Sequence, residues 1–359
     1  MYNLSLKYGI YPEKFKTSRI IPIFKSGDHL STDNYRPISL VSSFAKLLDK
    51  IVAIKLTNHL ELNQLLYKYQ FGFQKKLSTE HNLLHLTNFV SNSLNDGKYC
   101  IGIFLDLKKA FDVVSHEILI NKLEKFGIKG VSLEWFKSYL KNRKQRVDIN
   151  GSLSGPADID ISVLQGSTLG PILFLCFIND LHLATKLFTL LFADDTCALA
   201  ADKDLNALID FCNTELKKIA NWMVVNKLAV NVSKCKYIIF HNRGKNLTTE
   251  NKIVFNWNPL GGDDLQEKIL PLERISNKNI DHENRYYKYL GILLDENFSL
   301  NYHFDNICKK LSRGLFCLRR AKNLINNNSL KTLYFALFHS HLLYCTNILN
   351  CSSNANIKK

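Results

Sequence analysis

Proline, internal repeats and low-complexity tracts are scarce in this sequence. Only seven of its 359 residues are proline, and no segment repeats. Long linkers and disordered stretches are therefore not expected. With 46% hydrophobic residues, the chain can bury a large core and form more than one lobe.

Paired cysteines and long apolar runs are also lacking. The nine cysteines include no Cys-x-x-Cys pair, and their odd number favours a reduced intracellular compartment, without distinguishing nucleus from cytoplasm. The most apolar run, "PILFLCFINDL" at 171–181, is short and contains Asn179 and Asp180, and the first residues lack the apolar core of a signal peptide. We predict neither secretion nor membrane insertion.

Acidic residues are outnumbered, with 32 Asp and Glu against 47 Lys and Arg and a net charge of +15. Such a field attracts nucleic acid or an anionic membrane surface. Against this background, "LFADDTCALA" at 191–200 places Asp194 and Asp195 side by side in an apolar stretch. Two ionised carboxylates removed from water repel each other and need a compensating partner.

Strand signals place three acids at the ends of elements. The run "YCIGIFLDL" at 99–107 is typical of a strand buried on both faces, with Asp106 near its end. The segment "LFTLLFADDTCALA" at 187–200 predicts a β-hairpin with Asp194 and Asp195 at its turn. If these strands pair in one sheet, the three carboxylates meet.

Converging carboxylates in a basic protein favour a site for hard divalent cations such as Mg²⁺, which prefers oxygen ligands. Two such ions about 3.5–4 Å apart can activate an attacking hydroxyl and stabilise a leaving phosphate. The alternative is a hydrophilic turn and a strand-end cap, which would be the commoner explanation for an isolated Asp-Asp pair.

Helical periodicity and turn residues predict most of the remaining elements. Ser115 is a candidate N-cap, and Asp202 is expected to cap a long amphipathic helix. Residues 243–285 resemble a variable insertion, and "YYKYLGILLD" at 286–295 is a strand candidate. The predicted helices cover residues 45–66, 78–90, 115–127, 202–228, 304–325 and 329–345, and a strand is expected within 231–240.

Ordered motifs along nearly the whole chain resemble the reverse transcriptases of non-LTR (LINE-type, jockey-like) retrotransposons. The polymerase motifs are "FLDLKKAFDVVSHEIL", "LQGSTLGPILFLCFINDL" and "FADD". "IIPIFKSGD" and "NYRPISLVSSFAKLLDKIV" resemble fingers motifs, and "YQFGFQKKLSTEHNLLHL" the segment before the first catalytic strand. "LAVNVSKCKY" and "YKYLGILLD" resemble the segment after the catalytic hairpin and the primer-grip region.

The resemblance implies an α+β, right-hand polymerase fold with an antiparallel palm sheet packed on helices. Its parts would be fingers at 1–98, a palm at 99–298 with the insertion near 243–285, and a partial helical thumb at 299–359. The implied enzyme is an RNA-directed DNA polymerase, a nucleotidyltransferase. It would bind an RNA template, a DNA primer and dNTPs, with no membrane partner and an oligomeric state left open.

The resemblance also assigns roles to individual residues. Asp106, Asp194 and Asp195 would hold two Mg²⁺ ions, with Mn²⁺ a possible substitute, while a primer 3′-hydroxyl attacks the α-phosphate of a dNTP and releases pyrophosphate. Lys25 and Arg36 match fingers positions that hold the triphosphate. The structural alternative for both is a solvated surface cation.

Further roles follow from the later motifs. Phe111 matches an aromatic gate that leaves no room for a 2′-hydroxyl, although it could be a core phenylalanine. Gln165 and Gly166 match a loop that approaches nucleotide and template, or an ordinary helix-capping loop. Lys234 matches a general acid for the pyrophosphate, and Cys235 stands where many relatives carry threonine. Basic C-terminal helices could follow the template–primer backbone.

Two other functions stay open beside this one. The chain begins close to the fingers motifs and ends soon after the last predicted helix, so we expect a fragment of an open reading frame or a decayed copy. A catalytically inactive fragment or a domesticated RNA-binding scaffold is the first alternative. An RNA-dependent RNA polymerase is the second, and Phe111 argues against it.

Overall fold

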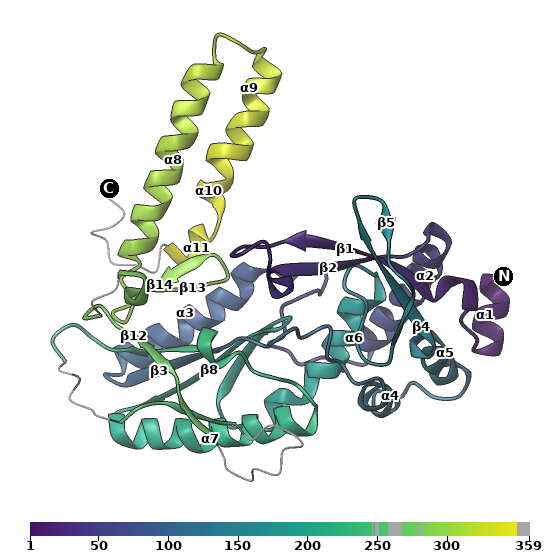
Figure 1. Cartoon of the computed structure of the whole chain (residues 1–359). Helices are drawn as coiled ribbons and strands as arrows, with labels where there is room; N and C mark the ends of the chain where they lie inside the picture. The colour runs from purple at the N-terminus through teal and green to yellow at the C-terminus, as the bar shows by residue number, and fades with distance from the viewer. Residues whose placement is uncertain (246, 248–250, 258–267, 280–281, 350–359) are drawn as a thin grey trace.

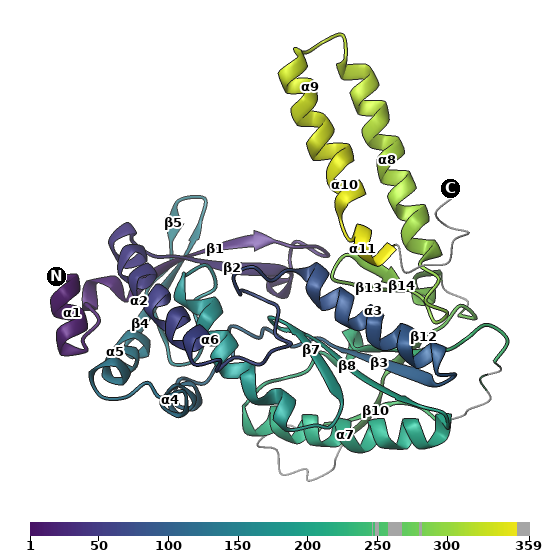
Figure 2. The same cartoon turned by 180° about the vertical axis from the view of Figure 1, so that it is seen from behind.

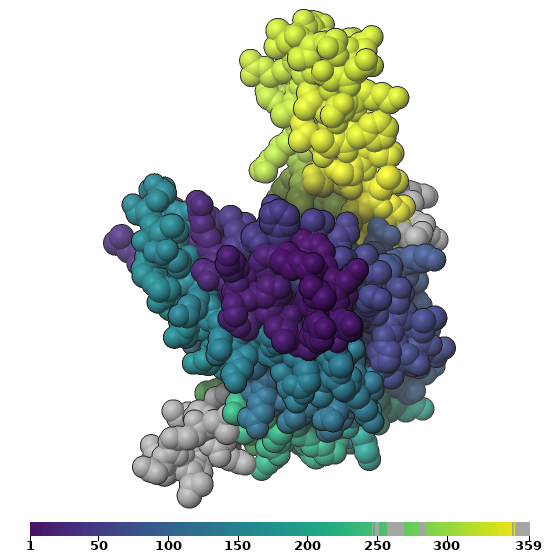
Figure 3. All heavy atoms as spheres, turned by 90° about the vertical axis from the view of Figure 1, so that its right-hand side faces the viewer, coloured from purple at the N-terminus to yellow at the C-terminus, as the bar shows by residue number. Residues whose placement is uncertain are grey.

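A computed structural model describes the chain except for residues 246, 248–250, 258–267, 280–281 and 350–359. Two five-stranded sheets form the body of the molecule, and a helical hairpin near the C-terminus stands clear of them (Figures 1, 2 and 3). The predicted α+β class is confirmed. The boundaries of fingers, palm and thumb stay a prediction. One of the two sheets combines strands from before and after residue 98, the predicted end of the fingers.

The central sheet has the strand order β12-β9-β3-β8-β7. Adjacent strands in this sheet are antiparallel, except that the edge strand β12 runs parallel to β9. The helices α7 and α3 cover opposite faces of this sheet (Figures 1 and 2). The bounds are β3 Tyr99–Leu105, β7 Phe188–Phe192, β8 Asp195–Asp202, β9 Lys236–Phe240, β12 Glu273–Ile275, α3 Thr79–Asn95 and α7 Leu205–Val225.

Strand β3 lies at the centre because both of its faces are apolar. Ile101 and Ile103 pack in the core beneath α7, whereas Cys100 and Phe104 pack in a second core together with Leu86 of α3. Side chains alternate across a strand, so one continuous apolar run serves two layers. The predicted strand buried on both faces is confirmed.

The second sheet joins β1 to β2 and β4, and β4 also pairs with β5 and β6. Pro37 is tolerated in β2 because β2 is an edge strand. Helix α6 is buried on nearly every side in the principal core. The bounds are β1 Thr17–Phe24, β2 Tyr35–Leu40, β4 Arg143–Ile149, β5 Ser152–Leu153, β6 Ala157–Ile159, α1 Tyr2–Tyr8, α2 Ser43–Leu62, α4 His116–Lys125, α5 Val131–Leu140 and α6 Leu169–Ile178.

A short hairpin and a group of helices complete the chain. The segment predicted as one strand at 286–295 is two, β13 Tyr287–Tyr289 and β14 Ile292–Leu294, because Leu290 and Gly291 both adopt positive φ and reverse the chain. The helices are α8 Asn301–Ala321, α9 Asn327–Tyr334, a π-helical turn at Phe335–His339, α10 Ser340–Leu343 and α11 Thr346–Leu349.

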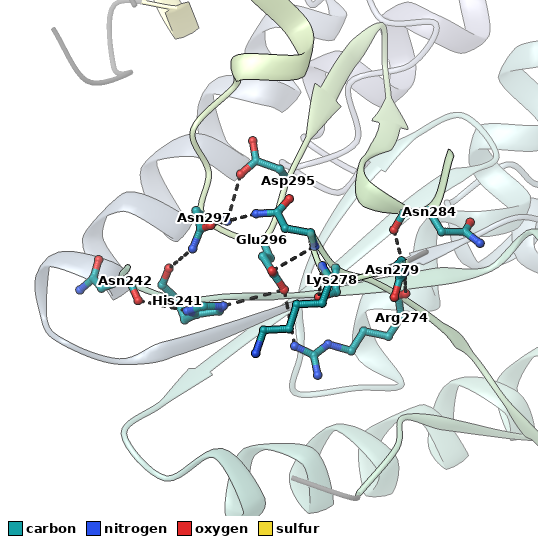
Figure 4. Close-up of polar contacts among 11 residues, drawn as sticks. His241, Asn242, Arg274, Lys278, Asn279, Asn284, Asp295, Glu296 and Asn297 are labelled. Carbon is teal, nitrogen blue, oxygen red and sulfur yellow. Dashed lines mark hydrogen bonds and ion pairs between the residues drawn. The ribbon is translucent and has the colours of Figure 1, made fainter. Parts of the chain in front are cut away.

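A buried polar network joins the central sheet to the start of α8 (Figure 4). Glu296 accepts a hydrogen bond from the Asn277 amide at 3.0 Å and pairs with Arg274 at 3.5 Å and His241 at 3.8 Å. Burial raises the pKa of Glu296, but hydrogen bonds and Arg274 more than offset it, so the pKa is lowered. Asp295 accepts the Leu300 amide at 3.0 Å and fixes the chain just before α8.

Several local predictions are corrected. Asp204, not Asp202, caps α7, because its Oδ1 accepts the amides of Asn206 at 2.9 Å and Ala207 at 3.3 Å. Ser115 holds the N-cap position of α4 without a side-chain capping bond. Part of 243–285 is regular structure, since β10 Val254–Trp257 pairs with β11 Lys268–Pro271 and β12 joins the central sheet.

Among the described helices, none combines the length and apolar character needed to cross a bilayer.

Candidate active site

The three predicted acids lie at one end of the central sheet. The β3–β8 register ends with Leu105 opposite Thr196, so Asp106, which follows β3, and Asp195, the first residue of β8, lie at the same end of the two strands. Asp194 occupies the turn between β7 and β8, which is the predicted hairpin. The structure therefore brings together acids separated by almost ninety residues of sequence.

The acids act on one another electrostatically. Loss of hydration, then the charges of Asp194 and Asp106, raise the pKa of Asp195 to about 6. Burial is the main cause that raises the pKa of Asp194, and Asp106 adds to it. Asp195 stays partly open to solvent, so water screens part of this repulsion.

Two cations at the second sheet act electrostatically on Asp194. Arg36 lies on β2 opposite Ile23 of β1, and Lys25 follows β1, with its amide bonded to the Asn34 carbonyl at 2.9 Å. Both Arg36 and Lys25 lower the pKa of Asp194, against the effect of burial. Both side chains are exposed, and within the described residues neither forms an ion pair. Exposed guanidinium and ammonium groups of this kind are suited to binding anions.

Phe111 and the loop at 165–166 are held by contacts with the core and with β2. The Phe111 ring stacks on Phe174 with the ring centroids 4.6 Å apart, and the residue is half-buried, so it packs on the core without being fully covered. The Ser39 amide donates to the Gln165 carbonyl at 2.7 Å, which docks the loop on β2. Gly166 has φ +104°, and a Cβ there would lie 3.0 Å from the Ser39 carbonyl oxygen, so glycine is required.

Lys234 is placed differently. It ends the 3-10 helix η4, Val232–Lys234, and is exposed, and only Lys25 and Arg36 appear among the described cations that lower the pKa of Asp194 or Asp195. Its neighbour Cys235 is buried, and the Cys235 sulfur accepts the Asp106 amide at 3.3 Å. Cys235 thus supports the backbone of an acid, while the role of Lys234 stays a prediction.

Sequence reasoning missed several residues behind the acids. Gln70 and Gly72 contact the turn that carries Asp194, and Tyr287 of β13 stacks on Phe104 at 4.4 Å. Burial raises the pKa of the Tyr287 hydroxyl, and the charges of Asp195 and Asp106 add to it, so this ring lies near the site. These contacts join residues far apart in the chain, so no local pattern in the sequence indicates them.

The donor set fits a hard divalent cation. Within the described residues, no three His, Cys, Asp or Glu side chains converge into a ready-made metal cage. Mg²⁺ does not need such a cage, because it keeps waters and substrate phosphates and takes only one or two carboxylates. The mutual repulsion of Asp106, Asp194 and Asp195 is what a bound cation would relieve.

Carboxylates suited to hard cations, together with cations suited to phosphate oxygens, are the types of side chain that nucleotidyl transfer uses. A family model described as "Reverse transcriptase (RNA-dependent DNA polymerase)" matches residues 23–294, well over half of the sequence. The chain therefore belongs to the reverse transcriptase family.

Curated relatives come from retrotransposons. The "RNA-directed DNA polymerase from mobile element jockey" of Drosophila melanogaster is 26% identical over 372 residues, covering 100% of this chain and 38% of the relative. The "Probable RNA-directed DNA polymerase from transposon BS" of the same fly is 30% identical over 348 residues, covering 93% of this chain and 35% of the relative. The chain thus spans under two-fifths of the length of these relatives.

Telomerases are among the solved structures that match part of this chain. A telomerase from Candida albicans, in complex with a fragment of telomeric RNA, has a TM-score of 0.46 and 13% identity, and the match covers 71% of this chain and 46% of that one. An apo telomerase from Candida tropicalis, truncated from its C-terminal domain, has a TM-score of 0.44 and 14% identity, and covers 71% of this chain and 56% of that one.

Proposed function

We propose that this chain is the polymerase portion of a non-LTR retrotransposon reverse transcriptase, and that it extends a DNA primer on an RNA template with dNTPs. The observation that carries the proposal is the placement of Asp106, Asp194 and Asp195 at one end of the central sheet, where Arg36 and Lys25 act electrostatically on Asp194. Membership of the reverse transcriptase family supports it.

In this proposal the acids hold two Mg²⁺ ions, a role that Mn²⁺ also suits. When bound, these ions supply Lewis acidity at the attacking hydroxyl and at the phosphate. Arg36 and Lys25 bind the triphosphate and orient the α-phosphate in line with the primer 3′-hydroxyl. Lys234 protonates the departing pyrophosphate, which requires the primer–template complex to bring it closer to the acids than the electrostatics of the free chain indicate.

Selectivity in this proposal comes from packing. The Phe111 ring is fixed against Phe174, so it cannot yield easily to a ribose 2′-hydroxyl. The loop of Gln165 and Gly166, docked on β2, contacts the incoming base pair through its backbone. Exposed cations on and beside α8 bind the template–primer phosphates without sequence preference, namely Lys309, Lys310, Arg313, Arg319, Arg320 and Lys322.

The cellular location belongs to the same proposal. The eight cysteines within the described residues are all free thiols, and six of them are buried in the cores. This pattern suits a reducing compartment, and we place the protein inside the cell.

Primer extension tests the proposed function. The purified chain is given a DNA primer annealed to an RNA template, with Mg²⁺ and dNTPs, and is compared with Asp194→Ala and with a matched control, Asp202→Ala, at the far end of β8. Extension by the parent and the control, absent from Asp194→Ala and from a reaction with rNTPs, supports reverse transcription. Template binding without extension by the parent would instead indicate an RNA-binding scaffold, and extension with rNTPs an RNA polymerase.

A further inference from the structure

The turn that carries Asp194 is held from behind by one buried side chain. The Gln70 Oε1 accepts the Ala193 amide at 3.0 Å and the Gly72 amide at 2.9 Å. Gln70 is only 1% exposed. Because both partners are donors, only the oxygen of the amide can occupy this position.

The segment around Gln70 runs beside β7 almost as an extra strand. The Phe71 amide donates to the Leu191 carbonyl at 2.8 Å, and the Leu191 amide donates to the Tyr69 carbonyl at 2.9 Å. At Gly72 the two backbones are so close that a Cβ would lie 2.3 Å from the Ala193 nitrogen. The segment is thus docked on β7 and directs the Gln70 side chain to the turn.

The turn needs this support because its backbone is strained. Ala193 has φ 57°, a left-handed conformation that is unfavourable for any residue with a Cβ. Asp194 follows directly, so the direction of its carboxylate depends on the Ala193 backbone. A second conformation of this turn would redirect the acid, and Gln70 selects one by bonding the Ala193 amide.

We propose that Gln70 is a positioning residue that fixes the Ala193–Asp194 turn and thereby sets the Asp194 carboxylate for binding a divalent cation. Gln70 does not touch the reacting atoms. The inference rests on the proposed function, and adds to it a residue outside the acids and the two cations. Pure packing in the core is the competing explanation, and it predicts a loss of stability without a change at the metal site.

The test compares Gln70→Met, which keeps the volume but removes the acceptor, with Gln70→Glu, which keeps an acceptor. Gln64→Met in an exposed turn is the matched control. Hydrogen exchange at the Ala193 amide should accelerate roughly ten-fold in Gln70→Met. Mn²⁺ affinity, measured from the spin-resonance signal of the free ion, should weaken, and the rate constant for single-nucleotide extension should fall roughly 10- to 100-fold.

Rescue separates positioning from packing. Ala193→Gly removes the Cβ that disfavours the left-handed turn, so adding it to Gln70→Met should restore part of the Mn²⁺ affinity. Parent-like exchange at Ala193 and parent-like Mn²⁺ affinity in Gln70→Met, with only a lower melting temperature, would overturn the inference. If Gln70→Met does not fold, Gln70→Glu still tests the inference. Its side chain keeps an acceptor for the Ala193 amide, so the inference requires hydrogen exchange at that amide to stay as slow as in the parent.

The two proposals can fail separately. Exchange at Ala193 and Mn²⁺ binding report on the turn even if the parent extends no primer. A parent that binds Mn²⁺ through Asp194 yet polymerises nothing would refute the proposed function and leave the role of Gln70 intact. A parent that polymerises while Gln70→Met matches it in exchange and in Mn²⁺ affinity would refute the role of Gln70 alone.

Discussion

Metal-dependent activity should fall steeply as the pH drops below about 6. Loss of hydration, Asp194 and Asp106 raise the pKa of Asp195 from 3.8 to about 6. Only the ionised carboxylate binds a cation, so roughly 90% of Asp195 is competent at about pH 7 and roughly 10% at about pH 5. Protons and Mg²⁺ compete for the same oxygens, and the apparent Mg²⁺ affinity should weaken about ten-fold for each pH unit below 6.

The assay is single-nucleotide extension between about pH 5 and about pH 8, at limiting and at saturating Mg²⁺. Saturating Mg²⁺ should move the acidic midpoint to lower pH. Because the carboxyl pKa of Asp195 is raised in the folded state, its ionisation destabilises the fold as the pH rises from 3.8 through about 6. Mg²⁺ binds the ionised form, so it should raise the melting temperature more at neutral pH than at acidic pH. A midpoint near pH 4 that ignores Mg²⁺ would refute this reasoning.

Three further outcomes are expected. Gly72→Ala should destabilise the fold by about 1–3 kcal/mol and abolish extension, because the added Cβ would meet the Ala193 backbone. Chemical denaturation measures the loss of stability, and Gly155→Ala is the control because a Cβ at Gly155 would meet no other atom. Phe111→Ala should raise rNTP incorporation relative to dNTP in a competition assay, and an unchanged ratio would exclude Phe111 as the gate. The pKa of Glu296 is lowered in the folded state, so ionised Glu296 stabilises the fold above about pH 4.5, and this stabilisation is lost as the pH falls through the folded-state pKa. In urea titrations at several pH values, Glu296→Gln should reduce this acid-induced loss of unfolding free energy. An unchanged dependence of the unfolding free energy on pH would contradict the prediction.

The sequence was sufficient for the parts of the site carried by local patterns. The apolar run before Asp106 and the two runs around Asp194 are periodic enough to define β3 and the β7–β8 hairpin, and a buried strand pairs with its neighbours in few ways. The Leu290-Gly291 reversal also carried a recognisable signal, since Gly at a turn between apolar runs is typical of a hairpin, but the prediction of one strand at 286–295 overlooked it.

Other features depend on contacts that no local pattern contains. Asp202 and Asp204 are both good caps, and only the folded chain shows that Asp204 reaches the first free amides of α7. Gln70 meets Ala193 across 123 positions of sequence, and Asn82 meets Leu191 across 109. A single glutamine or asparagine in an apolar segment does not reveal such a partner, because its role is set by the docking of two distant segments.

Incorporation of one dNTP opposite an RNA template is the most direct test that these acids form a polymerase site. Parent protein, Asp106→Asn and Asp194→Asn are mixed with primer–template and Mg²⁺ in single-turnover conditions, after equal template binding has been verified. The parent should add one nucleotide, and each variant should lose at least about a thousand-fold in rate. Equal rates in the parent and in both variants would contradict the account.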